Sequence, residues 1–213
     1  METPSRPIRL YRHPLSGHSH RAELFLSLLG LPFERVEVDL ARGEQKSPDF
    51  LAKSPLGLVP VIEDGDVTLP ESNAILVYLA SRYDPSGRWL PREAKAAAEV
   101  QRWLSIASGP LHVGPATARL VHVFGAKLDL ARSQAVAAQL FGAMDRHLAT
   151  RAFLAGAGAP TIADVALYSY TAHAPEGGVP LAPYDHVRAW LGRVEALPGF
   201  VPMRASPIPA ANP

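Results

Sequence analysis

The feature that most constrains the fold is a run spanning residues 56–79, in which a strand, a turn, a second strand and a helix start follow one another. Residues 59–62 are rich in β-branched side chains, residues 63–66 supply a turn that contains a glycine, and residues 67–69 can return antiparallel. Pro70 then restricts φ, and apolar side chains recur at helical spacing at Ile75, Leu76 and Leu79. The run predicts a hairpin followed by a helix.

Two places in this run are suited to hold a ligand. Pro60 has no N–H for a strand ladder, and a cis bond between Val59 and Pro60 would turn the backbone groups of Val59 outward as a docking edge for an extended peptide. At the helix start, unpaired N–H groups favour an anion, so Ser72 can hold a carboxylate while Glu71 takes an ammonium group. A ligand with a peptide-like middle and a free α-amino acid at one end satisfies both places.

In this order, the motif Val59-Pro-Val-Ile, a glycine turn and then Pro-Glu71-Ser72-Asn-Ala-Ile resembles the glutathione-binding segment of the cytosolic glutathione S-transferases. The resemblance implies that Val59, which precedes a cis Pro60, pairs with the cysteinyl unit of glutathione, and that Glu71 and Ser72 hold the γ-glutamyl end. The resemblance covers nearly the whole chain, from Leu10 to about Gly199. Within the family, the chain resembles the serine-type, bacterial-like members.

The order of the other segments fits this reading. Residues 8–11, 18–29 and 33–38 predict a strand, a helix and a parallel strand joined by a right-handed crossover, and a short helix is expected at residues 49–53. From Arg92 onward the pattern is helical, with breaks expected at Gly109-Pro110 and Gly114-Pro115. We expect an α/β N-terminal thioredoxin-like domain (residues 1–84), a linker (85–92) and an all-α C-terminal helical domain (93–213), which together form the glutathione transferase fold.

Composition excludes several classes of chemistry. The chain has 213 residues and no cysteine, so disulfides, thiolate metal sites and a protein thiol nucleophile are excluded. The net charge of +1 gives little attraction to nucleic acid or an anionic membrane, and the eight histidines lack acidic partners at metal-ligand spacing. Residues 1–9 lack a sustained apolar run, and no segment is long enough to span a membrane. We expect a cytoplasmic protein with no metal, nucleic-acid or membrane partner.

A serine near the first helix start is the expected catalytic group. The glutathione thiol has an ordinary pKa of about 8.5, so a hydroxyl that donates a hydrogen bond to sulfur at a helix N-terminus favours the reactive thiolate. Serine-type members of the family carry a serine in this loop, and the resemblance assigns the role to Ser16. Ser19 and His18 lie within reach of the same helix start and remain alternatives. Tyr11 is the remaining candidate, although its place in the first strand favours packing in the sheet.

Two lysines flank the short helix at residues 49–53. Lys46 precedes it and Lys53 follows it, so either can neutralise the glycyl carboxylate of glutathione, and both can also be solvated surface residues. The sequence departs from the family at Leu58, where many members carry Lys or Gln. An apolar side chain there cannot contact the glycyl carboxylate.

The second substrate is expected against the helical domain, near His112, Pro115, Arg119 and His122, which recur on one side of a helix apart from the prolyl break. Further along, Thr161 and Asp164 form a helix-start box in which each side chain reaches the other residue's N–H. The same box matches a folding signature of the family. We interpret Thr161 and Asp164 as a structural cap.

These observations predict a glutathione transferase that uses bound glutathione as co-substrate to attack a small apolar electrophile, in a detoxification role and as a homodimer. Glutathione-dependent disulfide reduction is an alternative, because some bacterial-like members of the family perform it without a protein cysteine. A non-catalytic glutathione-binding or ligand-binding module is the alternative from a different class. The sequence does not identify the electrophile, because the second pocket is assembled from residues far apart in the chain.

Overall fold

The computed structural model describes residues 3–156 and 158–209, and the chain divides into two compact units. The first unit runs to Leu90 and includes Leu197–Arg204, and the second comprises Pro91–Ala196 and continues from Ala205. The sequence placed residues 197–204 in the helical domain, but they group with the first unit. One contact that holds this segment against the first unit comes from Ser27, in the helix at Gly17–Leu28, whose Oγ donates to the Gly199 carbonyl at 2.6 Å.

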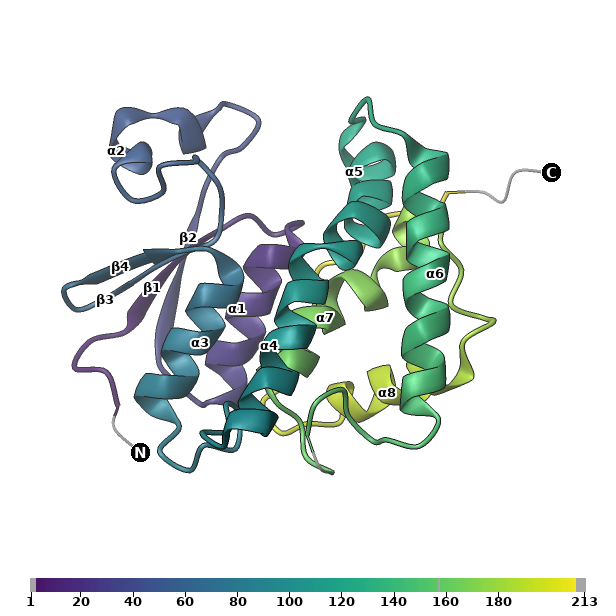
Figure 1. Cartoon of the computed structure of the whole chain (residues 1–213). Coiled ribbons are helices and arrows are strands. Elements are labelled where there is room, and N and C mark those ends of the chain that lie inside the picture. Colours follow the sequence, from purple (N-terminus) through teal and green to yellow (C-terminus); the bar gives the residue numbers. More distant parts are fainter. Residues whose placement is uncertain (1–2, 157, 210–213) are drawn as a thin grey trace. The chain divides into compact units, whose positions relative to one another are not determined.

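The first unit is built on a mixed four-stranded sheet in the order β2-β1-β3-β4, with β1 at Ile8–Arg12, β2 at Phe33–Glu37, β3 at Val61–Asp64 and β4 at Val67–Pro70. Strand β1 pairs parallel with β2 and antiparallel with β3, and β3 pairs antiparallel with β4 (Figure 1). The predicted parallel pair and the predicted hairpin are therefore confirmed.

The hairpin turn is shorter than the sequence suggested. Only Gly65 and Asp66 connect the strands, with Gly65 at φ 61°. Asp64 stays in the strand because its carboxylate accepts the hydroxyl groups of Tyr78, at 2.8 Å, and Tyr83, at 2.5 Å. Both tyrosines lie on the helix that follows, so this contact ties the hairpin to that helix.

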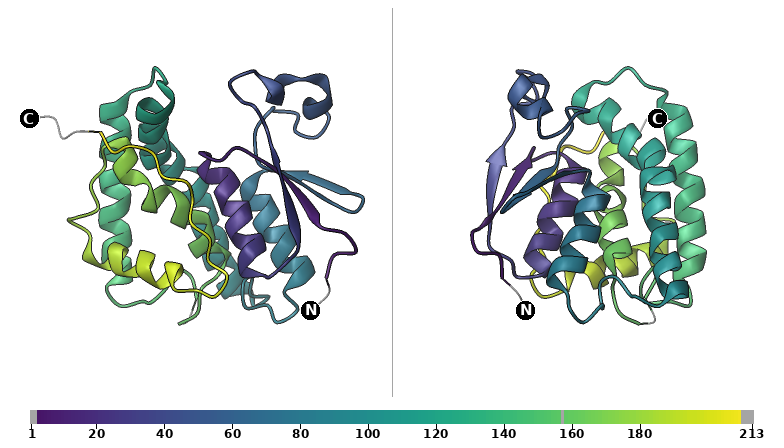
Figure 2. Two further views of the ribbon diagram at one scale, coloured as in Figure 1. Left: turned by 180° about the vertical axis from the view of Figure 1, so that it is seen from behind. Right: turned by 60° about the vertical axis from the view of Figure 1, so that its left-hand side comes forward.

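Helices α1 (Gly17–Leu28) and α3 (Ser72–Tyr83) lie side by side on one face of the sheet (Figure 2). Beneath them lie fully buried side chains of the sheet, such as Leu10 and Ile62. The alternate side chains point to the other face, where Tyr11 and Val61 pack against Phe50 of the short helix α2 (Pro48–Leu51). A single turn of 3₁₀ helix at Glu44–Lys46 precedes α2.

The second unit is helical throughout its described residues. Its elements are α4 (Ala94–Ser108), a π-helical turn (His112–Ala116), α5 (Thr117–Phe124), α6 (Leu130–Leu148), α7 (Ile162–Ala172), a 3₁₀ turn (Ala174–Gly177) and α8 (Asp185–Glu195). The predicted break is confirmed, since α4 ends before Gly109 and Pro115 lies in the π-helical turn. Helix α7 packs against α4 and α8 and is buried along almost its whole length.

Candidate active site

Ser16 lies at the N-cap of α1, with extended backbone angles of φ −89° and ψ 116°. Its Oγ accepts the backbone N–H of Ser19 at 3.2 Å, which is the ordinary role of a capping serine. A hydroxyl that accepts this bond still carries a proton to donate, and the side chain is only half-buried. Ser16 is therefore placed to donate a hydrogen bond to a ligand at the start of α1.

The alternatives to Ser16 have other contacts. Ser19 is fully buried, and its Oγ accepts the backbone N–H of His13 at 3.2 Å. Tyr11 donates its hydroxyl to Glu63 at 2.8 Å, and burial together with that carboxylate raises the pKa of the Tyr11 phenol. A phenol with a raised pKa and a committed proton is poorly suited to support a thiolate.

The start of α3 has unusual backbone geometry at Glu71. This residue has φ 72° and ψ 109°, and among the described residues it is the one non-glycine residue in the left-handed range. Such a conformation costs about 1–3 kcal/mol and persists where the site requires it. The side chain of Glu71 is exposed, whereas the Ser72 that follows is buried at the first helical position.

Two residues of α1, His18 and Arg21, contact the Ser72 side chain. The sequence pattern did not predict either contact. The Arg21 guanidinium, which is 1% exposed, donates from one nitrogen to Ser72 Oγ and to Asn73 Oδ1, both at 2.8 Å. The Nδ1 of His18 lies 3.1 Å from the same Ser72 Oγ. An arginine facing the helix start at Ser72 adds a positive charge where a carboxylate is expected. No local sequence pattern indicated this contact, because Arg21 and Ser72 are 51 residues apart.

The Val59-Pro60 peptide bond is cis. Among the described residues, no backbone hydrogen bond reaches the N–H or the carbonyl of Val59. The loop before it is fixed by the buried Ser54, whose Oγ accepts from the Leu58 N–H at 3.1 Å and donates to the Leu58 carbonyl at 3.0 Å. The backbone edge of Val59 is thus fixed in place by the Ser54 contacts and, within the described residues, has no backbone hydrogen bond.

The two lysines occupy different environments. Lys53 is paired with Glu63 and lies over the Tyr11 ring, 5.3 Å from its centroid. Lys46 is exposed, and its Nζ donates to the Leu56 carbonyl at 2.9 Å. An ammonium group has three donors, so Lys46 keeps two for a ligand beside the Val59 loop. Its position suits a carboxylate better than that of Lys53.

In the helical unit, the residues expected to face a second substrate are not all accessible. His112 is exposed at the start of the π-helical turn and His122 is exposed on α5, but Pro115 is buried. Arg119 is 2% exposed, and its Nε donates to Glu176 at 2.5 Å. The expectation that Arg119 lines a substrate pocket is not supported, because a buried ion pair of this kind cannot turn to a ligand without leaving a charge unpaired.

Glu176 is the centre of that buried cluster. It also accepts from His173 Nδ1 at 2.6 Å and from the backbone N–H of Ser206 at 2.9 Å. Burial alone would raise the pKa of the Glu176 carboxyl, but these donors and Arg119 hold it below its ordinary value. The cluster ties α5 to the segment after Ala205 within the second unit.

The helix-start box of α7 has the geometry of a cap. Asp164 is fully buried, and its carboxylate accepts the backbone N–H of Thr161 at 2.9 Å while Thr161 caps the helix in return. It also accepts from the Leu154 N–H and the Trp190 Nε1, each at 2.9 Å. These bonds engage both carboxylate oxygens, so this geometry agrees with a structural role.

Within residues 3–156 and 158–209, no three side chains of histidine, aspartate or glutamate gather in a group able to bind a metal ion. In the same ranges, no helix combines the length and apolar character needed to span a bilayer.

Three comparisons with known proteins all find glutathione S-transferases. Residues 6–81 match the family model for the glutathione S-transferase N-terminal domain. The chain is 37% identical to glutathione S-transferase 3 of Zea mays over 204 residues, which is 91% of each protein. Its fold is similar to that of a glutathione S-transferase from Pseudomonas fluorescens, with a TM-score of 0.87 and 33% identity over 93% of this chain and 99% of the other.

A second solved structure is a glutathione transferase homologue from Drosophila mojavensis with bound glutathione. It has a TM-score of 0.81 and 27% identity, and the match covers 90% of this chain and 89% of that one.

Proposed function

The chain belongs to the glutathione S-transferase family and is a glutathione transferase, and from this premise we propose which of its residues bind and activate glutathione. Ser16 donates a hydrogen bond to the thiolate sulfur. The backbone of Val59, which precedes Pro60, pairs with the cysteinyl unit. Glu71 binds the γ-glutamyl ammonium group, and Ser72 binds the adjacent carboxylate at the start of α3.

The observation that best supports this assignment is the set of contacts between the starts of α1 and α3. His18 and Arg21, in the first turns of α1, both reach Ser72 Oγ, at 3.1 and 2.8 Å. The two helix N-termini are thereby held close together, and each contributes its positive dipole end. A tripeptide can then place its carboxylate at one terminus and its sulfur at the other.

The chemical step follows from the pKa of the thiol. An unperturbed thiol with a pKa of about 8.5 is mostly protonated at neutral pH, and only the thiolate is a good nucleophile. A hydrogen bond from Ser16 and the field at the start of α1 stabilise the negative sulfur. The thiolate then attacks an electrophilic carbon, forms a carbon–sulfur bond and expels the leaving group, while the thiol proton passes to solvent.

We assign the glycyl carboxylate to Lys46 in preference to Lys53, which is engaged by Glu63. We propose that the electrophile is small and apolar, and that the exposed His112 borders its site. The chain is proposed to work in the cytoplasm in detoxification, without a metal and without a nucleic-acid or membrane partner. A homodimer is proposed because Leu56 and Leu58 are 67% and 53% exposed and would be covered by a second copy.

An aryl halide is the direct test of the reaction class. With glutathione present, the purified protein should turn over an aryl halide faster than a disulfide, because we propose that the electrophile is a small apolar molecule attacked at carbon. Both rates are measured spectrophotometrically at equal protein concentration. Faster turnover of the disulfide would reassign the chain to glutathione-dependent reduction.

Replacing Glu71 with glutamine should raise KM for glutathione about tenfold and leave kcat nearly unchanged, since the charge-assisted bond to the ammonium group forms before and during the reaction. Steady-state kinetics with varied glutathione measure both constants. Asp66→Asn, which removes an exposed carboxylate from the hairpin turn, is the matched control and should behave as wild type. Equal KM values in both variants would remove Glu71 from the glutathione site.

A further inference from the structure

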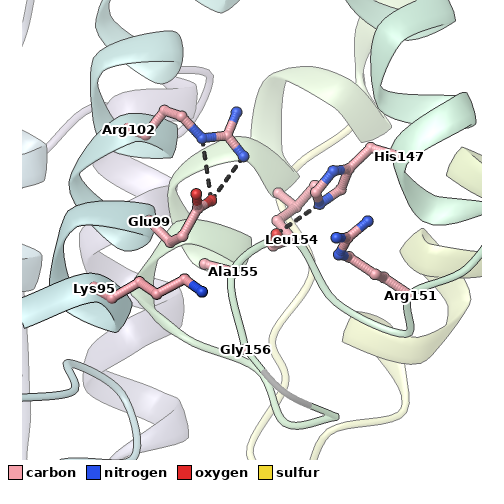
Figure 3. Close-up of a pocket in the computed structure, with 8 residues that line it drawn as sticks. All are labelled: Lys95, Glu99, Arg102, His147, Arg151, Leu154, Ala155 and Gly156. Atoms are coloured by element: carbon pink, nitrogen blue, oxygen red, sulfur yellow. Dashed lines mark hydrogen bonds and ion pairs between the residues drawn. The ribbon is translucent and has the colours of Figure 1, made fainter. Parts of the chain in front are cut away.

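The helical unit contains a cavity of about 390 Å³, and none of the proposed glutathione residues lines it. Figure 3 shows the side chains around it, and its lining residues are Lys95, Glu99, Arg102, His147, Arg151, Leu154, Ala155 and Gly156. Cavities of roughly 300–1,000 Å³ are typical of small-molecule sites. Its lining is unusually rich in basic groups.

Local helical geometry gathers these groups. Lys95, Glu99 and Arg102 are spaced four and three residues apart, so they share one face of α4. His147 comes from the last turn of α6, and Arg151 follows just after that helix ends. In Figure 3 the side chains of Lys95 and Arg151 come from opposite sides of the cavity.

One of the three cationic side chains is neutralised within the protein. Arg102 donates from Nη2 and Nε to one oxygen of Glu99, at 2.8 and 3.1 Å, and this pairing keeps the carboxylate charged. Lys95 and Arg151, unlike Arg102, have no carboxylate partner at ion-pair distance within the described residues. The cavity therefore carries about two uncompensated positive charges.

His147 fixes one wall of the cavity. Burial lowers the pKa of the His147 imidazole and the hydrogen bond to Leu154 opposes this, while Arg151 and Arg102 lower the pKa further. Its Nε2 donates to the Leu154 carbonyl at 2.8 Å, and its ring packs edge-on against Trp103 at 5.0 Å. The His147 ring thus anchors the loop at residues 154–156, which lines the cavity.

The same loop is held from its other side. The Leu154 N–H donates to the buried Asp164 at 2.9 Å, so both backbone groups of Leu154 are engaged by side chains. Because the backbone of Leu154 is already fixed before a ligand binds, binding requires less loss of conformational entropy in this loop.

We propose that this cavity binds a compact dianion, such as a phosphate monoester or a small dicarboxylate, between Lys95 and Arg151. Two positive groups on opposite walls match two negative charges on one small ligand. Arg151 can bind a phosphate or carboxylate group through two parallel N–H bonds, and Lys95 supplies a point charge. The lining residues belong to the second compact unit of the chain, whereas the proposed glutathione residues belong to the first.

Isothermal titration calorimetry tests the site with three probes: inorganic phosphate, glycerol phosphate and succinate. The wild-type protein should bind at least one of them, and the double variant Lys95→Gln/Arg151→Gln should bind it about tenfold or more weakly. The tightest-binding probe identifies the acid group. Turnover with glutathione should be unchanged in this variant, which also shows that it is folded.

The control is the double variant Lys127→Gln/Arg146→Gln, which removes the same charge from exposed positions of the helical unit that do not line the cavity. It should bind the probes as wild type does. The proposal is overturned if no probe binds the wild-type protein, or if both double variants lose affinity equally, because the binding would then depend on overall charge alone.

Discussion

Replacing Ser16 with alanine is expected to lower kcat/KM with an aryl halide by about 10²-fold, the loss typical for one hydrogen-bond donor to a developing or stabilised anion. The affinity for glutathione should change little, because the γ-glutamyl and cysteinyl units are held by other residues. The pKa of the bound thiol should rise toward its ordinary value. Steady-state kinetics give the first result, and ultraviolet absorbance of the thiolate during a pH titration gives the second.

Ser19→Ala is the matched control, three residues along the same turn. The Ser19 hydroxyl is buried and accepts from His13, so its loss should affect stability more than the thiol pKa. If Ser19→Ala raised the pKa of the bound thiol and Ser16→Ala did not, the donor to sulfur would be Ser19. A large effect of His18→Ala on kcat alone would instead assign the role to His18.

Replacing Asp164 with alanine is expected to destabilise the protein by about 3–5 kcal/mol, because several buried donors lose their acceptor together. The N–H groups of Leu154 and Thr161 and the indole N–H of Trp190 all donate to this carboxylate at 2.9 Å. Urea unfolding followed by circular dichroism measures the change in the free energy of unfolding. Turnover per folded molecule should stay close to that of wild type.

Asp129 provides the comparison, since it caps α6 from an exposed position and its carboxylate accepts the Arg132 N–H at 2.9 Å. Asp129→Ala should cost about 1 kcal/mol, the usual value for one N-cap. Equal losses from the two substitutions would mean that the buried network around Asp164 adds nothing beyond an ordinary cap. Lost turnover in folded Asp164→Ala would contradict its structural role.

The fold was accessible from the sequence where local signals agreed with each other. The hairpin, the parallel pair and the helix breaks follow from alternation, glycine and proline positions, and the capping box follows from the spacing of Thr161 and Asp164. The turn was expected to begin at residue 63 and begins at Gly65, two residues later. The contact that keeps Asp64 in the strand comes from Tyr83, 19 residues later, which a local pattern cannot indicate.

In the candidate site too, local patterns predicted individual residues but not the contacts between residues far apart in the chain. Helix-start chemistry and the family motif predict Ser16, Glu71 and Ser72 as site residues, but the contact of Arg21 with Ser72 joins residues 51 positions apart. Arg119 was expected at a pocket because its helical spacing is right. Its burial depends on Glu176, 57 residues away, and only the three-dimensional structure reveals that partner. Helical periodicity predicts which residues share a face, but not what covers that face.

The central claim is that one glutathione molecule bridges the starts of α1 and α3, and a crystal structure of the glutathione complex tests it most directly. The account predicts the sulfur within hydrogen-bond distance of Ser16 Oγ, the cysteinyl backbone paired with Val59, and the γ-glutamyl group on Glu71 and Ser72. A glutathione molecule bound with its sulfur away from Ser16, or leaving Glu71 and Ser72 without contact, would contradict it.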